Sequence, residues 1–221
     1  MTDHIKRRGL FAMAGAGTLA PSITWAQGGK AMTRIDFENV ASGTLPPGVT
    51  TALTGGGGPV AWSVLDDATA PAGPKVLAQT SRDRTDNRFP LAIFSQPTAA
   101  DLDVAVRFKP VAGEVDRAAG IALRLSDADN YYVVRANALE DNVRLYKVVK
   151  GRRSQFAGAD TKVASGVWQE LRLKVEGSRF EVFLDGKSLY TASDTTFAAA
   201  GRVALWTKAD SVTYFDDLRI S

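Results

Sequence analysis

The chain has 221 residues and a formal net charge of +3, from 27 basic and 24 acidic side chains. It contains no cysteine, which excludes disulfide bonds, thiolate metal sites and a lipid anchor attached to cysteine. The basic residues form no stripe along the sequence, so we expect no nucleic-acid partner.

The first 26 residues are predicted to be an export signal. Lys6-Arg7-Arg8 precedes a short apolar run, and small residues at Thr24 and Ala26 suit cleavage before Gln27. The paired arginines resemble a twin-arginine signal, with a general secretory signal as the alternative. The run is too short to span a bilayer of about 30 Å, so we expect a periplasmic or secreted protein with no stable membrane anchor.

Removal of residues 1–26 leaves a single predicted domain over residues 27–221 with a net charge of +1. The one histidine, His4, lies in the predicted signal. The mature domain is therefore predicted to lack a histidine base, a Ser-His-Asp triad and histidine metal ligands. The sequence leaves the oligomeric state open.

Strands are predicted throughout the mature domain from alternating apolar and polar residues. A four-glycine run over 55–58 has no following helix and is predicted to be a flexible loop, and 152–166 is predicted to be irregular with at most one short edge strand. The clearest pattern is a three-stranded meander over 120–151. The predicted strands cover 34–38, 61–65, 76–79, 89–94, 102–108, 121–125, 131–137, 143–148, 168–175, 180–184, 189–191, 201–207 and 211–220.

No segment has a sustained helical period. Short strands separated by Gly, Asn and Asp-Gly turns predict an all-β sandwich of two curved antiparallel sheets. The parity of the last strand changes between Phe215 and Leu218, which predicts a β-bulge at Asp216-Asp217.

Several motifs resemble the concanavalin-A-like jelly rolls. They are the run from Asp127 to Arg135, the strand that begins at Trp168, the run from Arg179 to Lys187 and the closing Tyr214-Phe-Asp-Asp-Leu-Arg-Ile. Within that superfamily the chain is most similar to the 3-keto-disaccharide hydrolase domain family, a relative of laminin-G modules and family-sixteen glycoside hydrolases. The resemblance covers nearly all of residues 35–220.

The resemblance implies a jelly-roll β-sandwich with carbohydrate as its partner, and in the hydrolase family a disaccharide oxidised at C3 as the substrate. A non-catalytic, lectin-like binding module and a laminin-G-like structural interaction domain are the alternatives. The family-sixteen enzymes carry a Glu-x-Asp-x-x-Glu strand; Glu114 and Asp116 match it here, but Ala119 replaces the second glutamate, which argues against β-glucanase activity.

Cleavage of a glycoside usually requires two carboxyl groups, about 5–9.5 Å apart. Asp116 and Glu140 are the predicted catalytic pair, although carboxylates at turns commonly bond their own backbone instead. With a 3-keto sugar, one carboxylate base and an electrophile for the developing enolate could suffice. Arg88, Arg135 and Lys208 are the candidates for that electrophile.

Further sugar-binding residues are predicted on the face of the sheet that points away from the core. Arg135 and Asn137 have that parity, as does Trp206, with Lys208 and Asp210 just beyond it. An outward indole could stack on a sugar ring while its polar neighbours bond hydroxyl groups. The alternative is that a loop covers Trp206 and makes it part of a second small core.

A structural calcium ion is a further prediction. Jelly-roll sugar-binding modules often hold calcium between their first and last strands, where Glu38 and Asp217 could supply two oxygens. Calcium takes six to eight oxygen ligands, so most of the others would have to be backbone carbonyls.

Overall fold

The computed structural model describes residues 1–2 and 32–221 and contains fifteen strands and no helix within them. No helix long and apolar enough to cross a membrane occurs in this described part. The predicted signal at 1–26 lies, apart from its first two residues, outside the described residues. The strands are β1 (Thr33–Ile35), β2 (Val49–Gly55), β3 (Trp62–Asp66), β4 (Lys75–Gln79), β5 (Arg88–Ala99), β6 (Leu102–Ala112), β7 (Ala118–Asp127), β8 (Asn130–Asn137), β9 (Asn142–Val149), β10 (Arg152–Asp160), β11 (Gln169–Glu176), β12 (Arg179–Leu184), β13 (Lys187–Ser193), β14 (Gly201–Trp206) and β15 (Val212–Ile220).

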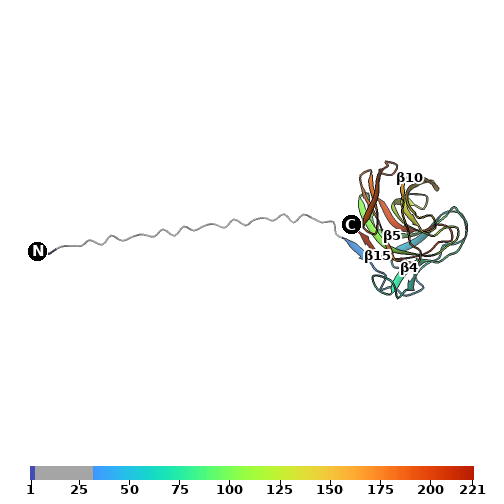
Figure 1. Ribbon diagram of the computed structural model, residues 1–221, viewed down its shortest axis with the longest axis horizontal. Helices are drawn as coiled ribbons and strands as arrows, with labels where there is room; N and C mark the ends of the chain where they lie inside the picture. Colours follow the sequence, from blue (N-terminus) through green and yellow to red (C-terminus); the bar gives the residue numbers. More distant parts are fainter. Residues whose placement is uncertain (3–31) are drawn as a thin grey trace. The chain divides into compact units, whose positions relative to one another are not determined.

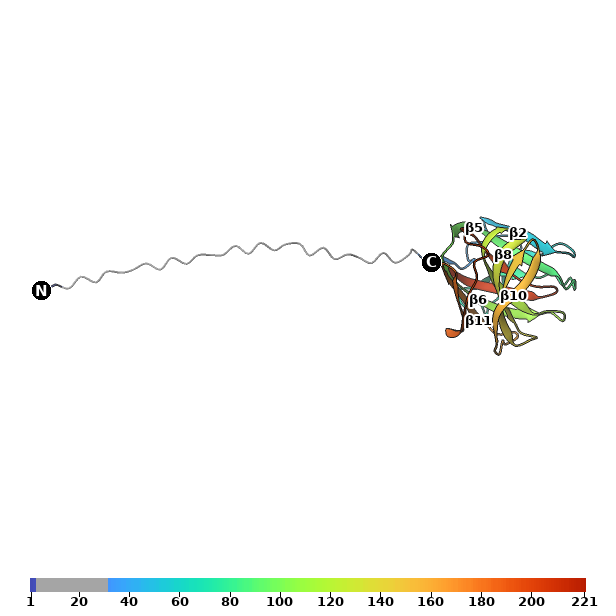
Figure 2. The ribbon, with the colours of Figure 1, turned by 90° about the horizontal axis from the view of Figure 1, so that it is seen from above.

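The strands form two antiparallel sheets, as the sequence predicts. One sheet has eight strands in the order β13-β12-β11-β6-β15-β4-β3, with β1 paired to β15. The other has seven strands in the order β10-β9-β8-β7-β14-β5-β2. Figures 1 and 2 show the two layers within residues 32–221; in Figure 2, β5, β2 and β8 of the seven-stranded sheet lie above β6 and β11 of the other.

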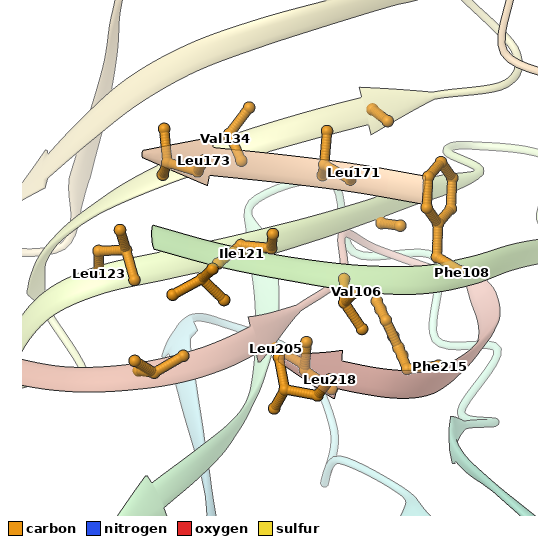
Figure 3. Packing of buried hydrophobic residues seen from close by; sticks show 14 of the residues in the cluster. Val106, Phe108, Ile121, Leu123, Val134, Leu171, Leu173, Leu205, Phe215 and Leu218 are labelled. Atoms are coloured by element: carbon orange, nitrogen blue, oxygen red, sulfur yellow. The ribbon is translucent and has the colours of Figure 1, made fainter. Parts of the chain in front are cut away.

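Apolar side chains from both sheets fill the space between the layers. Phe108, Leu171 and Phe215 from the eight-stranded sheet pack with Ile121, Leu205 and their neighbours from the seven-stranded sheet (Figure 3). All of these side chains are buried, and their removal from water is the main favourable contribution to folding.

Strand alternation gives the seven-stranded sheet a second, outward surface, which we call the outer face. In β8, Tyr132, Val134 and Ala136 belong to the inter-sheet core, whereas Tyr131 and Val133 belong to a separate apolar cluster. That second cluster also contains Phe89, Tyr146, Val148 and Trp206. Both faces of this sheet are therefore largely buried.

Four local features test the sequence predictions. Gly55 is the last residue of β2 and only 56–58 lie in a loop, so the loop prediction is confirmed for these three residues. The register of β15 shifts between Asp216 and Arg219, where Asp217 has a φ of 48°, so the predicted bulge is confirmed. The segment 152–166 was predicted to be mainly irregular; it contains the nine-residue edge strand β10, which carries one bulge. Strand β2 was not predicted, because its sequence, VTTALTG, is polar and only partly buried.

Candidate functional site

The centre of the outer face is an aromatic floor formed by Phe89, Tyr131, Tyr146 and Trp206. The rings of Phe89 and Trp206 are stacked with centroids 5.3 Å apart. The indole Nε1 of Trp206 donates to the Tyr131 hydroxyl at 3.2 Å, and that hydroxyl lies 2.8 Å from Thr54 Oγ1. These hydrogen bonds hold the Trp206 and Tyr131 rings in fixed positions.

Beside the aromatic floor lies a group of charged and amide side chains, which we call the polar cluster: Asp116, Arg135, Asn137, Glu140, Asn142 and Lys208. Asp116 Oδ1 accepts a hydrogen bond from Asn137 at 2.9 Å, and its Oδ2 lies 2.8 Å from Lys208 Nζ. The ammonium of Lys208 also pairs with Asp86. This arrangement brings together five residues predicted from the sequence: Asp116, Arg135, Asn137, Glu140 and Lys208.

The second half of the polar cluster is centred on Arg135. Its Nη2 donates to Glu140 Oε2 at 2.7 Å and to Asn142 Oδ1 at 2.6 Å, while its guanidinium carbon lies 5.5 Å from the centroid of the Tyr146 ring. Pairing of β8 with β9 sets this geometry, because Asn137 is opposite Asn142 and the short turn between them carries Glu140. The Nε of Arg135 is buried and has no acceptor among the described residues.

The two carboxyl groups of the polar cluster differ in exposure and in proton affinity. Asp116 is fully buried, and burial raises its pKa although Lys208 opposes the shift. Glu140 has a side chain that is 48% exposed. Burial acts to raise its pKa too, but hydrogen bonding by Asn142 and the charge of Arg135 bring that pKa below its ordinary value. The cluster thus holds an ionised carboxylate at the surface and a second carboxyl beneath it.

Two residues predicted to contact substrate instead hold loops. Arg88 is fully buried and donates to the carbonyl oxygens of Gly58, Pro59 and Ala209, so its prediction as a ligand-binding residue is wrong. The carboxylate of Asp210 accepts hydrogen bonds from the amides of residues 114–116. It therefore positions the loop that carries Asp116, and its predicted direct role is also wrong.

The predicted sugar platform at Trp206 is corrected in the same way. The indole lies on the outer face, as its parity predicts, but it is fully buried among Phe89, Tyr131 and neighbouring side chains. The guanidinium carbon of Arg153 lies 5.8 Å from its ring centroid. Of the two alternatives considered for Trp206, the small second core is the one that forms.

The calcium ligands predicted at Glu38 and Asp217 do not fit a shared metal site. The carboxylate of Asp217 pairs with Arg34 at 2.5 Å and with Arg219 at 3.5 Å, while Glu38 Oε1 accepts from the amide of Lys75. Within residues 1–2 and 32–221 no three acidic or histidine side chains gather around a point where they could hold a metal ion. Two arginines on Asp217 leave its oxygens committed to ion pairs.

Sequence reasoning missed Asp86, Asn142 and Arg153. Asp86 belongs to the charged run 81–88, which has no periodicity and reads as a solvated loop. Arg153 lies in β10, which was not predicted as a full strand, so its side chain had no assigned face. Strand pairing across the sheet, rather than any local pattern, brings Asn142 and Arg153 to the outer face, whereas Asp86 reaches it from the loop before β5 through its ion pair with Lys208.

Comparison with known proteins identifies the family to which the chain belongs. The family described as "Galactocerebrosidase, C-terminal lectin domain" matches residues 91–221, more than half of the chain. The chain belongs to this lectin-domain family. The matched region includes the whole polar cluster and excludes Asp86 and Phe89.

Other proteins are similar to this chain over part of its sequence or in fold. Levanase of Bacillus subtilis is 31% identical over 84 residues, which make up 37% of this chain but only 12% of levanase. Carbohydrate-binding module CBM66 from Bacillus subtilis has a TM-score of 0.62 at 21% identity, covering 79% of this chain and 96% of the module. A β-glucanase of Bacillus licheniformis has a TM-score of 0.56 at 12% identity, and the match covers 89% of this chain and 99% of the β-glucanase. The two structures share the jelly-roll fold with the lectin domain.

Proposed function

We propose that this lectin domain binds carbohydrate through the polar cluster on its outer face. The supporting observation is that two exposed carboxylates, Asp86 and Glu140, flank two nearly buried cations, Lys208 and Arg135. Sugar hydroxyl groups both donate and accept hydrogen bonds, so alternating carboxylates and cations suit them.

The first ligands to test are fructans. The name levanase denotes an enzyme that acts on levan, and this chain resembles a short part of it. Fructan oligosaccharides are uncharged, so their recognition would depend on hydroxyl groups alone. We place this binding function in the periplasm or outside the cell, in keeping with the signal predicted at residues 1–26.

A second candidate is hydrolysis of 3-keto-disaccharides. The observation that favours it is that Asp116 and Glu140 belong to one polar cluster, where they pair with the cations of Lys208 and Arg135. Glu140 would remove the proton at C2, which the neighbouring ketone acidifies, and Arg135 or Lys208 would stabilise the enolate oxygen. The glycosidic oxygen would leave C1 as a hydroxyl group after taking up the proton held by Glu140. Water would then add to the resulting C1=C2 double bond, with its hydroxyl group on C1 and a proton on C2, which completes the cleavage.

Isothermal titration calorimetry tests both functions. Levan oligosaccharides, a 3-keto-disaccharide and the unoxidised parent of that disaccharide are titrated separately. We expect Glu140→Ala to weaken binding by roughly tenfold or more, because it removes a charge-assisted hydrogen bond. Glu176→Ala is the matched control, since Glu176 is an exposed carboxylate paired with Lys174 on the other sheet. Equal affinities for the two variants would contradict the proposed site.

Sugar release in the same samples separates the enzyme from the binding module. Release from the keto-disaccharide alone, abolished by Glu140→Ala, would establish the hydrolase. Binding without release would assign the polar cluster to recognition only. If no sugar bound and none were released, a structural interaction domain would become the leading interpretation.

A further inference from the structure

Arg153 occupies an unusual position on the outer face. Its guanidinium carbon lies 4.4 Å from the centroid of the Tyr146 ring, 4.8 Å from that of Phe89 and 5.8 Å from that of Trp206. Aromatic faces attract a cation, and this attraction is larger where the cation is removed from water. Three rings therefore fix the position of one guanidinium at the edge of the aromatic floor.

This guanidinium has no acidic partner. In the described part of the chain Arg153 forms no ion pair, and its buried Nη1 has no hydrogen-bond acceptor. Burial lowers the pKa of Arg153, yet an arginine stays charged at any physiological pH. The two carboxylates that act on it electrostatically, Asp86 and Asp116, both pair with Lys208. A partly desolvated positive charge is left without a counterion, which is costly.

A hollow of about 330 Å³ opens beside Arg153. This volume falls within the roughly 300–1,000 Å³ usual for small-ligand pockets. No acidic residue lines it; the lining residues are Gly55, Asn87, Phe89, Gly151, Arg152 and Arg153. The side chains around the hollow are therefore those of two arginines, an asparagine and a phenylalanine, and none of them is negatively charged.

Backbone geometry keeps the rim of the hollow open. Gly55 has a φ of +82°, and a Cβ there would lie 1.9 Å from the carbonyl oxygen of Asn87. Gly151 has a φ of +73° in the turn between β9 and β10, which places Arg152 and Arg153 at the start of β10. Side chains at these two positions would be strained, so glycine maintains the close approach of the two loops.

We propose that this hollow binds an oxyanion carried by a saccharide, such as the carboxylate of a uronic acid, and that Arg153 is its principal ligand. A guanidinium presents two parallel donors that match a carboxylate or a sulfate. The inference rests on the proposed function and extends it, since it makes an acidic saccharide the preferred ligand of the lectin domain.

The hollow and the polar cluster are close enough to contact one oligosaccharide. Arg135 and Arg153 both lie against the Tyr146 ring, so their guanidinium carbons are at most about 10 Å apart. A neutral sugar residue on the polar cluster and an acidic residue in the hollow could therefore belong to the same chain.

The test compares trigalacturonate with its full methyl ester and with galactotriose by titration calorimetry. We expect the acid to bind at least tenfold more tightly than either neutral sugar, and this preference to shrink as salt is raised from 50 to 500 mM, since salt screens charges. Inorganic sulfate is included to measure the oxyanion alone. Equal affinities for acid and ester would overturn the proposal while leaving neutral sugar binding at the polar cluster intact.

Arg153→Met removes the charge but keeps an apolar chain over the rings, and Arg153→Lys keeps the charge but loses the paired donors. We expect Arg153→Met to abolish the preference for the acid and to change the affinity for galactotriose by less than twofold. The preference of Arg153→Lys for the acid should lie between those of Arg153→Met and the unaltered protein. Arg179→Met, an exposed arginine of the other sheet, is the control. If Arg153→Met fails to fold, Arg153→Lys against the control makes the same comparison.

Two further outcomes separate this inference from the proposed function. Binding of trigalacturonate that is lost in Arg153→Met but unchanged in Glu140→Ala would support the hollow and remove the polar cluster from sugar recognition. If none of the three sugars bound and sulfate had no effect on the melting temperature, the proposal for the hollow would fail; the proposed function would fail only if levan oligosaccharides and the 3-keto-disaccharide also did not bind. Retention of the acid preference in Arg153→Met would overturn the hollow alone.

Discussion

The outward surfaces of the two sheets differ in how far their charged side chains are exposed and in whether they are paired. On the eight-stranded sheet, Arg172 pairs with Asp103 and Arg219 with Glu170, and these side chains remain 20–39% exposed. On the seven-stranded sheet, Asp116 and Arg135 are 0% and 3% exposed, and Arg153 has no partner.

The difference lies in how the charges of each surface affect stability. Exposed pairs of opposite sign contribute little to stability, about 0–1 kcal/mol each, and keep a sheet face wetted. Buried charges and an unpaired guanidinium destabilise the protein unless a ligand or a network compensates them. The same sandwich thus has one face with solvated ion pairs and one face with buried charges, and the second is the face on which we propose that carbohydrate binds.

The largest expected effect comes from the aromatic floor. Trp206→Ala should reduce the free energy of unfolding by about 3–5 kcal/mol, because it opens a cavity and removes the donor to Tyr131. Trp168→Ala, which removes a partly exposed indole beside Lys109 on the other sheet, should cost roughly 1 kcal/mol. Urea denaturation measures both. Similar losses would mean that the two outward surfaces are packed alike.

A smaller effect is expected from separating the buried ion pair. Lys208→Met should cost about 3 kcal/mol at pH 7, because it leaves Asp116 buried without its cation. The pKa of Asp116 is raised in the folded state. The contribution of Asp116 to the free energy of unfolding is therefore fully present below the ordinary pKa of 3.8 and is lost as the pH rises through the folded-state pKa.

The cost of Lys208→Met should therefore shrink when unfolding is measured near pH 4. Arg172→Met is the matched variant on the solvated face and should cost about 0–1 kcal/mol at either pH. A pH-independent deficit for Lys208→Met would show that Asp116 does not respond to the loss of its partner.

The smallest effect concerns the loop beside the hollow. The amides of Thr85 and Gly58 hold the pKa of Asp83 at about 2. A lowered pKa stabilises the fold above the ordinary value, and this stability is lost as the pH falls from about 4 to about 2. Asp83→Asn should flatten the decline of the melting temperature over that range, whereas Glu176→Gln on the other sheet serves as control. An unchanged decline would contradict this role.

The fold could be predicted because strand alternation is a local property. The parity of Tyr131 through Asn137 assigns each side chain of β8 to the correct face, and the change of parity after Phe215 locates the bulge. Weakly alternating segments escaped prediction. Strand β2 is half-exposed, and β10 is an edge strand with a bulge, so neither has a strong period.

The site was predicted only in part because parity gives a direction but not the depth of burial. Arg135, Glu140 and Lys208 have the expected orientation and meet in the polar cluster. Trp206 has it too, yet neighbouring side chains bury its indole completely, and Arg88 is fully buried as well. Arg153 could not be found, because its role depends on three rings that come from β5, β9 and β14.

The placement of β15 has a consequence for the order of folding. This last strand lies between β6 and β4 in the middle of the eight-stranded sheet and also pairs with β1. Strand β15 is synthesised after the other fourteen strands, so β6 and β4 lack their shared neighbour until β15 has left the ribosome. Since contacts between distant segments form slowly, the facing edges of β6 and β4 stay unpaired until then, and unpaired strand edges favour aggregation.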